Sequence, residues 1–506
     1  MTESLPRWPI LGGRWQPFHL GHLSVLQMLL ETNPRVIVAV VNPDPLNPFD
    51  RSFDRFRLED NPLNYWERTW LFSRIGLDEH QLGRVHIVPT WHPRASVERE
   101  SYYLPPQRHR YWYVPALEDS ESAKASDMRR LGETIVLADD IPMGLEFRSS
   151  LIRAKIRRGQ DVSTTVPAGT AEVFAATETV GQQWFPSLAR EFAMLVGRFQ
   201  PFHRGHAWAL QWAAERYEHV VIAVRVPEPP RTAGDDPQHD DAHGAHNPLT
   251  YWQRMLAISA TVNDLGLTQS TTVAPCWPPL WQVAGEEAFL PRKRVWLLPD
   301  ANGTGVELTA GLRSSGEDCI RVPVPQELTH ISGALVRRLA SRGDNAWKDL
   351  VPSSAVIALE EMHFPDLARA SAAKWPKFVE SYLDSKQQAT VLFQGSGVGQ
   401  AGAPTAAVLA VMLARVEDLL AYSTEHVATR ERLLERLPQA GVGLEELQLW
   451  RARRSRLIAL GARVRQASAR IGRSELLNML DLVNSAGREI LADAWDPIDT
   501  VGESPA

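Results

Sequence analysis

Short apolar runs without polar alternation recur along the first 365 residues, separated by stretches with helical spacing. The clearest runs are 36–41 (VIVAVV) and 220–224 (VVIAV), which follow helical patterns at 23–31 and 207–216. Further short strands are expected at 85–88, 111–114 and 295–298. Continuous apolar strands separated by helices are typical of a parallel sheet covered on both faces. Right-handed crossovers between such strands predict a doubly wound α/β fold.

One motif occurs twice in the chain. It reads GGRWQPFHLGH at 12–22 and VGRFQPFHRGH at 196–206, so His19 corresponds to His203. Other landmarks return in the same order at nearly the same offset: 61–68 as 247–254, 110–115 as 294–299, and 149–153 as 333–337. Landmarks in one order at nearly one spacing indicate a duplicated domain. We place a first copy at 5–182 and a second copy at 188–365.

The chain changes character after the second copy. Residues 384–404 include a Gly- and Gln-rich stretch and predict a flexible linker. Apolar positions at helical spacing then predict a helical domain at 405–495. Arginines crowd its expected helix 444–469, and we interpret them as a solvated face rather than a nucleic-acid patch. The predicted fold class is α/β: two tandem doubly wound, Rossmann-like parallel-sheet domains and a C-terminal all-α region.

Composition narrows the classes of protein. The chain has 506 residues, is 44% apolar and carries a net charge of −6, which argues against general binding to nucleic acid. No apolar run is long enough for a membrane span, and residues 1–7 resemble no signal peptide. Cys276 and Cys319 are the only cysteines, so a disulfide framework is excluded. We expect a cytoplasmic protein without nucleic-acid or membrane partners.

The repeated motif has the residues needed to bind phosphate. A turn from strand to helix presents free backbone N–H groups, and the helix dipole favours anions there. The motif's histidines are three residues apart and so share one face of the first helical turn. Its glycine between them lets a flat base approach the backbone. The preceding Arg14 and Arg198 can add charge-assisted contacts. Such donors, without a nucleophile, suit phosphoryl or nucleotidyl transfer.

The two segments resemble the His-x-Gly-His signature of the HIGH nucleotidyltransferase superfamily. Their longer form is most similar to archaeal-type nicotinamide-nucleotide adenylyltransferases. Residues 331–338 (ISGALVRR) resemble the family's Ile-Ser-Gly-x-x-Ile-Arg helix start, and 247–254 resemble its Asp-Pro-Phe…Glu-Arg helix. The resemblance covers about 360 residues and implies joining of AMP from ATP to a phosphorylated acceptor, with release of pyrophosphate. The expected acceptor is nicotinamide mononucleotide and the product NAD.

The resemblance also implies roles for individual residues. Those expected in catalysis, by binding the transferring and leaving phosphates, are His203, His206, Arg337, His19, His22 and Arg153. Those expected to bind ATP are Gly197, Arg198, Phe199, Gly205, Ser332, Asp300, Gly13, Arg14, Trp15 and Gly21. Those expected at the acceptor are Trp277, Trp281, Trp91, Arg254 and Arg68. Magnesium is expected to bind mainly through ATP phosphates, without dedicated protein ligands.

The copies differ in places that affect function. The second copy has Ser332 and Asp300 where the first has Arg148 and Ala116, so we expect the second to be the surer catalyst. The first copy can be active, altered in substrate, or structural. Another phosphorylated acceptor, or CTP as the donor, stays open. So does a non-catalytic nucleotide or NAD sensor whose C-terminal helices act as effector, or mediate homo-oligomerisation.

Overall fold

The computed structural model describes most of residues 8–373 and one long helix nearer the C-terminus, together with scattered residues between 416 and 486. The described ranges are 8–41, 61–90, 102–115, 125–126, 128–138, 147–175, 178–180, 183–185, 191–226, 247–276, 289–291, 293–299, 312–313, 316–329, 331–373 and 444–466, with 416, 420, 427, 478–479, 482–483 and 485–486. The expected linker at 384–404 lies outside these residues.

The first copy forms a five-stranded parallel sheet. Its strands are β1 (Trp8–Gly13), β2 (Val36–Val41), β3 (Val85–Thr90), β4 (Arg110–Pro115) and β5 (Ile135–Ala138), in the order β3-β2-β1-β4-β5. The apolar run of β2 is buried along nearly its whole length, as expected for a strand covered on both faces. The strand order reverses between β1 and β4, which is where doubly wound sheets bind ligands.

The second copy repeats this architecture. Its strands are β8 (Phe192–Gly197), β9 (Val220–Arg225), β10 (Thr271–Cys276), β11 (Arg294–Pro299) and β12 (Asp318–Val322), in the order β10-β9-β8-β11-β12. All neighbouring strands are parallel. The reversal lies between β8 and β11, so both copies of the histidine motif follow a strand at this position.

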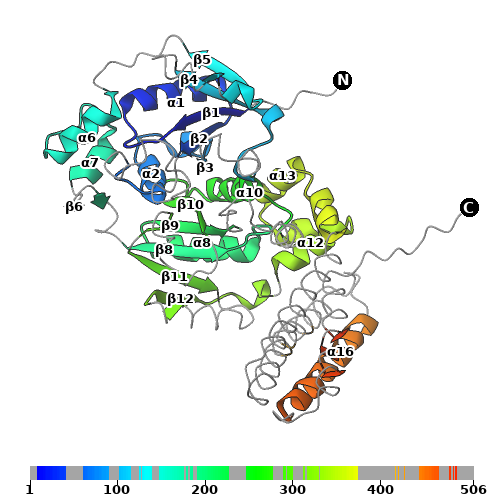
Figure 1. Cartoon of the computed structure of the whole chain (residues 1–506). Helices are drawn as coiled ribbons and strands as arrows, with labels where there is room; N and C mark the ends of the chain where they lie inside the picture. The colour runs from blue at the N-terminus through cyan, green and yellow to red at the C-terminus, as the bar shows by residue number, and fades with distance from the viewer. Residues whose placement is uncertain are drawn as a thin grey trace, which may run out of the picture. The chain divides into compact units, whose positions relative to one another are not determined.

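Helices connect and cover the strands (Figure 1). In the first copy these are α1 (Leu20–Thr32), α2 (Tyr65–Phe72), α3 (Glu79–Leu82), the 3-10 helix η2 (Gln107–His109), α6 (Ser149–Arg157) and α7 (Ala168–Ala175). After them come the short strands β6 (Glu178–Val180) and β7 (Gln183–Phe185), which pair antiparallel. The later helices are α8 (Arg204–Ala214), α10 (Tyr251–Asp264), η5 (Gln326–Leu328), α12 (Gly333–Ser341), η6 (Asn345–Leu350), α13 (Ser353–Glu361) and α16 (Leu444–Gln466).

The chain divides into two compact units. The first contains residues 1–235, 249–324 and 351–362, and therefore both sheets. The second contains residues 236–248, 325–350 and 363–506, and therefore α12 and α16. Within this second unit, Trp347 of η6 packs edge to face on Phe364, with ring centroids 5.4 Å apart. The boundary between the two copies thus differs from the boundary between the compact units.

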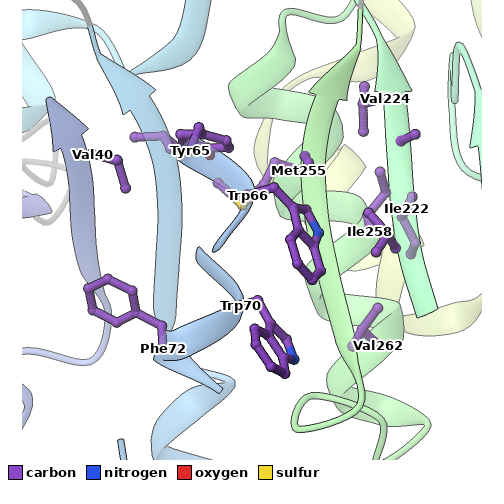
Figure 2. Packing of buried hydrophobic residues seen from close by; sticks show 14 of the residues in the cluster. Val40, Tyr65, Trp66, Trp70, Phe72, Ile222, Val224, Met255, Ile258 and Val262 are labelled. Carbon is purple, nitrogen blue, oxygen red and sulfur yellow. The ribbon is translucent and has the colours of Figure 1, made fainter. Parts of the chain in front are cut away.

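The hydrophobic core of the first unit runs through both copies (Figure 2). Trp66 and Trp70 of α2 stack on one another at 5.6 Å, and both meet Phe192 of β8 edge to face. Met255 and Ile258 of α10 belong to the same core. The helices α2 and α10 therefore lie between the two sheets and bury apolar surface from both copies.

A buried ion pair attaches the last strand of each sheet. Glu133, two residues before β5, accepts hydrogen bonds from Arg110 and from the Trp112 indole (3.0 Å) of β4. In the second copy Glu317 accepts from Arg294 and from the Trp296 indole (2.7 Å). A buried carboxylate needs such partners, because desolvation without them is costly. The same device in both sheets fixes the edge strands β5 and β12.

The predicted fold class is confirmed, and the differences concern element ends and strands that the sequence did not predict. The first helix of each copy begins at Leu20 or Arg204, three residues earlier than expected. The reason is that the first histidine of each motif, His19 or His203, is the N-cap residue of the helix. The edge strands β5 and β12 were not predicted: they are short, and both expose apolar or charged side chains. The C-terminal α16 is present near its expected position. None of the described helices is long and apolar enough to cross a membrane.

Candidate functional site

The loop before each first helix has the same backbone in both copies. Trp15 and Phe199 adopt positive φ angles of 52° and 51°. The peptide bonds Gln16–Pro17 and Gln200–Pro201, which follow them, are cis. Two aligned segments with the same unusual conformation indicate that the motif specifies one local structure wherever it occurs. Non-glycine residues with positive φ, such as Trp15 and Phe199, cluster at functional sites.

The aromatic residue of the loop folds back over the end of its strand. A Cβ atom at Gly13 would come within 2.8 Å of the Trp15 ring, and one at Gly197 within 2.8 Å of the Phe199 ring. Both rings are buried, and the Trp15 indole donates to the Ala39 carbonyl at 3.0 Å. These four predicted ATP-binding residues therefore shape the loop, and the two aromatic side chains among them pack within the protein.

The two motif histidines of each copy cap the first helix together. His19 precedes α1, and its Nδ1 accepts from the His22 backbone N–H at 3.3 Å, while His22 Nδ1 accepts from the His19 N–H at 3.3 Å. The rings stack with centroids 3.4 Å apart. In the second copy the His203 N–H donates to His206 Nδ1 at 3.2 Å, and the centroids are 3.6 Å apart. The structure thus brings together both predicted pairs.

These hydrogen bonds determine where each imidazole carries its proton. A ring nitrogen that accepts a hydrogen bond has no hydrogen, so a neutral ring must carry its proton on Nε2. Burial lowers the pKa of His19 to about 3. Burial, followed by repulsion from the partner histidine, holds the pKa of His22 and His206 well below the usual range. The rings of His19, His22 and His206 are therefore neutral, and each keeps its Nε2–H group as a donor.

A glutamine that the sequence analysis did not single out connects the loop to the next helix. Gln16 donates to the Leu63 carbonyl at 2.7 Å and accepts from the Leu63 N–H at 3.0 Å. Gln200 makes the same pair of bonds with Leu249, at 2.8 and 3.0 Å. Both glutamines are buried. The sequence did contain an indication of their role, since Gln16 and Gln200 occupy equivalent positions in the two copies of the motif.

Arg68 and Arg254, predicted at the acceptor, are buried in the helices α2 and α10. Arg68 Nη1 donates to the carbonyls of Arg14 (2.9 Å) and Val41 (3.0 Å). Arg254 Nη1 donates to the carbonyls of Arg198 (2.8 Å) and Arg225 (2.6 Å). Each guanidinium thereby ties the motif loop to the end of the neighbouring strand. A contact with acceptor stays a prediction.

In the first copy, the helix α6 reaches the histidine motif. Arg153 is buried and donates from Nη1 to the Gln16 carbonyl at 2.9 Å. The ring of Phe147, just before α6, stacks on His19 with centroids 6.2 Å apart. Arg153 therefore lies beside the histidine loop, as the predicted site requires.

The corresponding residues of the second copy belong to the second compact unit. Ser332 caps α12, where its hydroxyl accepts from the Leu335 N–H at 3.2 Å. Arg337 is buried on the same helix. Serine at this position suits a helix start because its hydroxyl satisfies a free backbone N–H. Four further candidates, Asp300, Trp91, Trp277 and Trp281, lie outside the described residues.

The donor set around each motif favours an anion. Imidazole N–H groups lie at the start of α1 and α8, where the helix dipole adds positive potential. The partly buried Arg14 and exposed Arg198 precede the pairs. Within the described ranges, no three histidine, cysteine or carboxylate side chains gather as metal ligands would. The site can therefore bind phosphate oxygens and stabilise charge developing on them.

Comparison with known proteins yields one family. A family model described as cytidylyltransferase-like matches residues 10–60 and 194–246, which include both histidine motifs. A nicotinamide-nucleotide adenylyltransferase from Ignicoccus hospitalis is 26% identical over 171 residues, which is 34% of this chain and 91% of that protein. A phosphonoformate cytidylyltransferase from Streptomyces viridochromogenes is 30% identical over 179 residues, 34% of this chain and 92% of that protein. Each match is about as long as one copy.

Among solved structures, this chain is similar to a bifunctional NMN adenylyltransferase/ADP ribose pyrophosphatase from Francisella tularensis, in complex with AMP and a manganese ion. The identity is 14% and the TM-score 0.26, and the match covers 39% of this chain and 56% of that one. A likeness of this size carries no argument about function.

Proposed function

Because this chain belongs to the cytidylyltransferase-like family of nucleotidyltransferases, we propose that it transfers AMP from ATP to a phosphorylated small molecule. We propose nicotinamide mononucleotide as the acceptor and NAD as the product. The observation that carries the proposal is the pair of stacked histidines at a helix start, which occurs in both copies. The name of the relative from Ignicoccus hospitalis supports the choice of acceptor.

The proposed reaction is an in-line displacement at phosphorus. An oxygen of the acceptor's phosphate attacks the α-phosphorus of ATP, and a new P–O bond forms. The bond from the α-phosphorus to the bridging oxygen breaks, and pyrophosphate leaves with that electron pair. No protein nucleophile takes part, so catalysis consists of positioning and of neutralising charge. The two histidine pairs are suited to this task.

The histidines would donate hydrogen bonds to the phosphates. With Nδ1 engaged by backbone N–H groups, His22 and His206 can direct Nε2–H toward oxygens of the transferring and leaving groups. A neutral donor in a buried site needs little reorganisation during the reaction, and donors of this kind are worth ~10²–10³ in rate. Arg153 would add positive charge beside the first pair.

Magnesium fits this donor set as a companion of the nucleotide. The groups at this site are imidazoles whose Nδ1 is engaged by backbone N–H groups, and a guanidinium, which has no lone pair to offer a cation. Mg²⁺ would therefore enter on the β- and γ-phosphates of ATP, consistent with its habit of retaining few protein ligands. When bound, it would neutralise phosphate charge.

Cytidylyl transfer is the second candidate function. The relative from Streptomyces viridochromogenes, at 30% identity, is named as a phosphonoformate cytidylyltransferase. That reaction would have the same chemistry at the α-phosphorus, and the histidine pairs would serve it equally. The choice between ATP and CTP depends on contacts with the base.

The direct test is an assay of the full chain with Mg²⁺, supplying ATP or CTP and a panel of acceptors that includes nicotinamide mononucleotide and phosphonoformate. Pyrophosphate release and the mass of the product are measured together. We expect NAD from ATP and nicotinamide mononucleotide. CMP transfer with CTP would favour the second candidate, and nucleotide binding without pyrophosphate release would favour a sensor.

Two single variants divide the activity between the copies. His206→Ala should lower turnover by the second copy about a hundredfold or more, because it removes a donor to the developing charge. His22→Ala tests the first copy in the same way. The control is His80→Ala, since His80 is exposed and belongs to neither motif. Full activity in the double variant His22→Ala/His206→Ala would refute the proposed site.

A further inference from the structure

The two copies pack against each other as nearly equivalent halves. Trp252 of the second copy meets Trp8 of the first edge to face, with centroids 5.0 Å apart. The corresponding residues with the copies exchanged are Trp66 and Phe192, and they meet edge to face at 4.5 Å. This contact between the copies thus recurs with the roles of the two copies exchanged. Contacts that recur in this way are typical of two copies related by a two-fold axis.

A second set of contacts obeys the same exchange. Tyr65 of the first copy packs on Phe289 of the second at 5.2 Å, and Tyr251 packs on Tyr103 at 5.1 Å. In the repeated segments 61–68 and 247–254, Tyr251 is the counterpart of Tyr65. Phe289 is the counterpart of Tyr103, because the same number of residues separates the two members of each pair. The pseudo-two-fold relation therefore holds for both sets of contacts between the copies.

One contact breaks this symmetry. The Tyr102 hydroxyl of the first copy accepts a hydrogen bond from Arg254 Nη2 of the second at 2.6 Å. The guanidinium also lies over the Tyr102 ring, 5.8 Å from its centroid. At the offset that relates Tyr103 to Phe289, the counterpart of Tyr102 is Ala288, so the sequence of the second copy has no tyrosine at this place. The contact between the Tyr102 hydroxyl and Arg254 is therefore made to the arginine of the second copy.

Arg254 transmits this contact to the histidine loop. Its Nη1 holds the Arg198 carbonyl, which lies within the motif, and the Arg225 carbonyl at the end of β9. The side chain is 1% exposed, so water cannot replace a lost partner. A planar guanidinium held at Nη2 has its Nη1 direction fixed as well.

We infer that Tyr102 is a positioning residue for the second copy's site, so that the first copy supports catalysis by the second. It orients Arg254, and Arg254 sets the backbone from which His203 and His206 are presented. The inference rests on the proposed function only for its kinetic consequence, since the structural coupling is independent of the reaction.

The variant Tyr102→Phe removes the acceptor and retains the ring. In a His22→Ala background, which reports the second copy, we expect kcat to fall about tenfold, the size of a lost hydrogen bond to a buried charge. In a His206→Ala background, which reports the first copy, kcat should stay unchanged. Tyr111→Phe is the matched control, because the Tyr111 hydroxyl contacts Asn33 within the first copy.

A double-mutant cycle separates positioning from a general loss of stability. If Tyr102 acts through Arg254, Tyr102→Phe should have no further effect on kcat once Arg254→Gln is present. Additive losses in the double variant would overturn the inference. Equal losses in both histidine backgrounds would overturn it too.

A third measurement does not depend on catalysis. Amide hydrogen exchange of Tyr102→Phe should increase in the loop 197–206 and not in the loop 13–22, because only the former is held through Arg254. This outcome would sustain the inference even if the chain transferred no nucleotide, and so separates it from the proposed function. Unchanged exchange in both loops, or the same increase in both, would refute it.

Discussion

His86 makes folding of the first compact unit depend on pH. It lies on β3 between Trp8 (5.5 Å) and Trp252 (5.8 Å), at the interface between the copies, and is 4% exposed. Neither ring nitrogen has a hydrogen-bond partner among the described residues. Burial, reinforced by the nearby Arg35 cation, lowers the pKa of His86 to about 3. We predict that His86→Phe makes the protein less sensitive to acid.

The magnitude follows from proton linkage. With a pKa near 6.5 in the unfolded chain and about 3 in the folded one, His86 binds more protons when unfolded. Its contribution is therefore fully present above pH 6.5 and is lost as pH falls from 6.5 toward 3. Between pH 7.5 and pH 5 this amounts to about 2 kcal/mol of unfolding free energy. Phenylalanine retains the ring contacts and removes the titration.

The assay is urea unfolding of the full chain at pH 7.5 and pH 5, followed by tryptophan fluorescence, because Trp8, Trp66 and Trp252 report on the interface. Wild type should lose about 2 kcal/mol more than His86→Phe over this interval. His80→Gln, at an exposed histidine, is the control and should behave as wild type. An identical pH dependence in wild type and His86→Phe would refute the reasoning.

Two further predictions concern the motif loop. Gln200→Leu should lower the free energy of unfolding, measured in urea, by about 2–4 kcal/mol, because it leaves the buried N–H and carbonyl of Leu249 without their partner. The control is Gln211→Leu, on the exposed face of α8. An equal loss of stability in this control would contradict the assignment. Gly197→Ala should lower turnover by the second copy at least about tenfold, because the new Cβ would lie 2.8 Å from the Phe199 ring. Restoration of turnover by adding Phe199→Leu would identify that clash as the cause, and undiminished turnover in Gly197→Ala would exclude it.

The two copies illustrate how a repeated sequence comes to serve unequal roles. Their sheets have the same strand order, and their histidine loops have the same backbone. Their interface is symmetric at Trp66 and Trp252 but not at Tyr102. A single hydroxyl on one side is enough to make one site depend on the other half of the unit.

The sequence by itself determined the local structure. Continuous apolar runs such as 36–41 specify buried parallel strands whatever surrounds them. The motif residues from Gly13 to His22 fold on one another, so a strand, a tight turn and a helix could be predicted from the sequence, although the helix begins three residues earlier than expected. The two histidine pairs were identified for the same reason, since residues three apart at a helix start must meet.

Only the tertiary structure decided what the remaining polar residues contact. Arg68 and Arg254 were expected at an acceptor, yet their guanidiniums hold carbonyls of the motif loops, because each helix brings its arginine to the end of a distant strand. The Tyr102–Arg254 bond joins residues 152 positions apart. No periodicity encodes such a pairing: it arises from how two complete sheets pack, and packing depends on the shape of whole surfaces rather than on spacing along the chain.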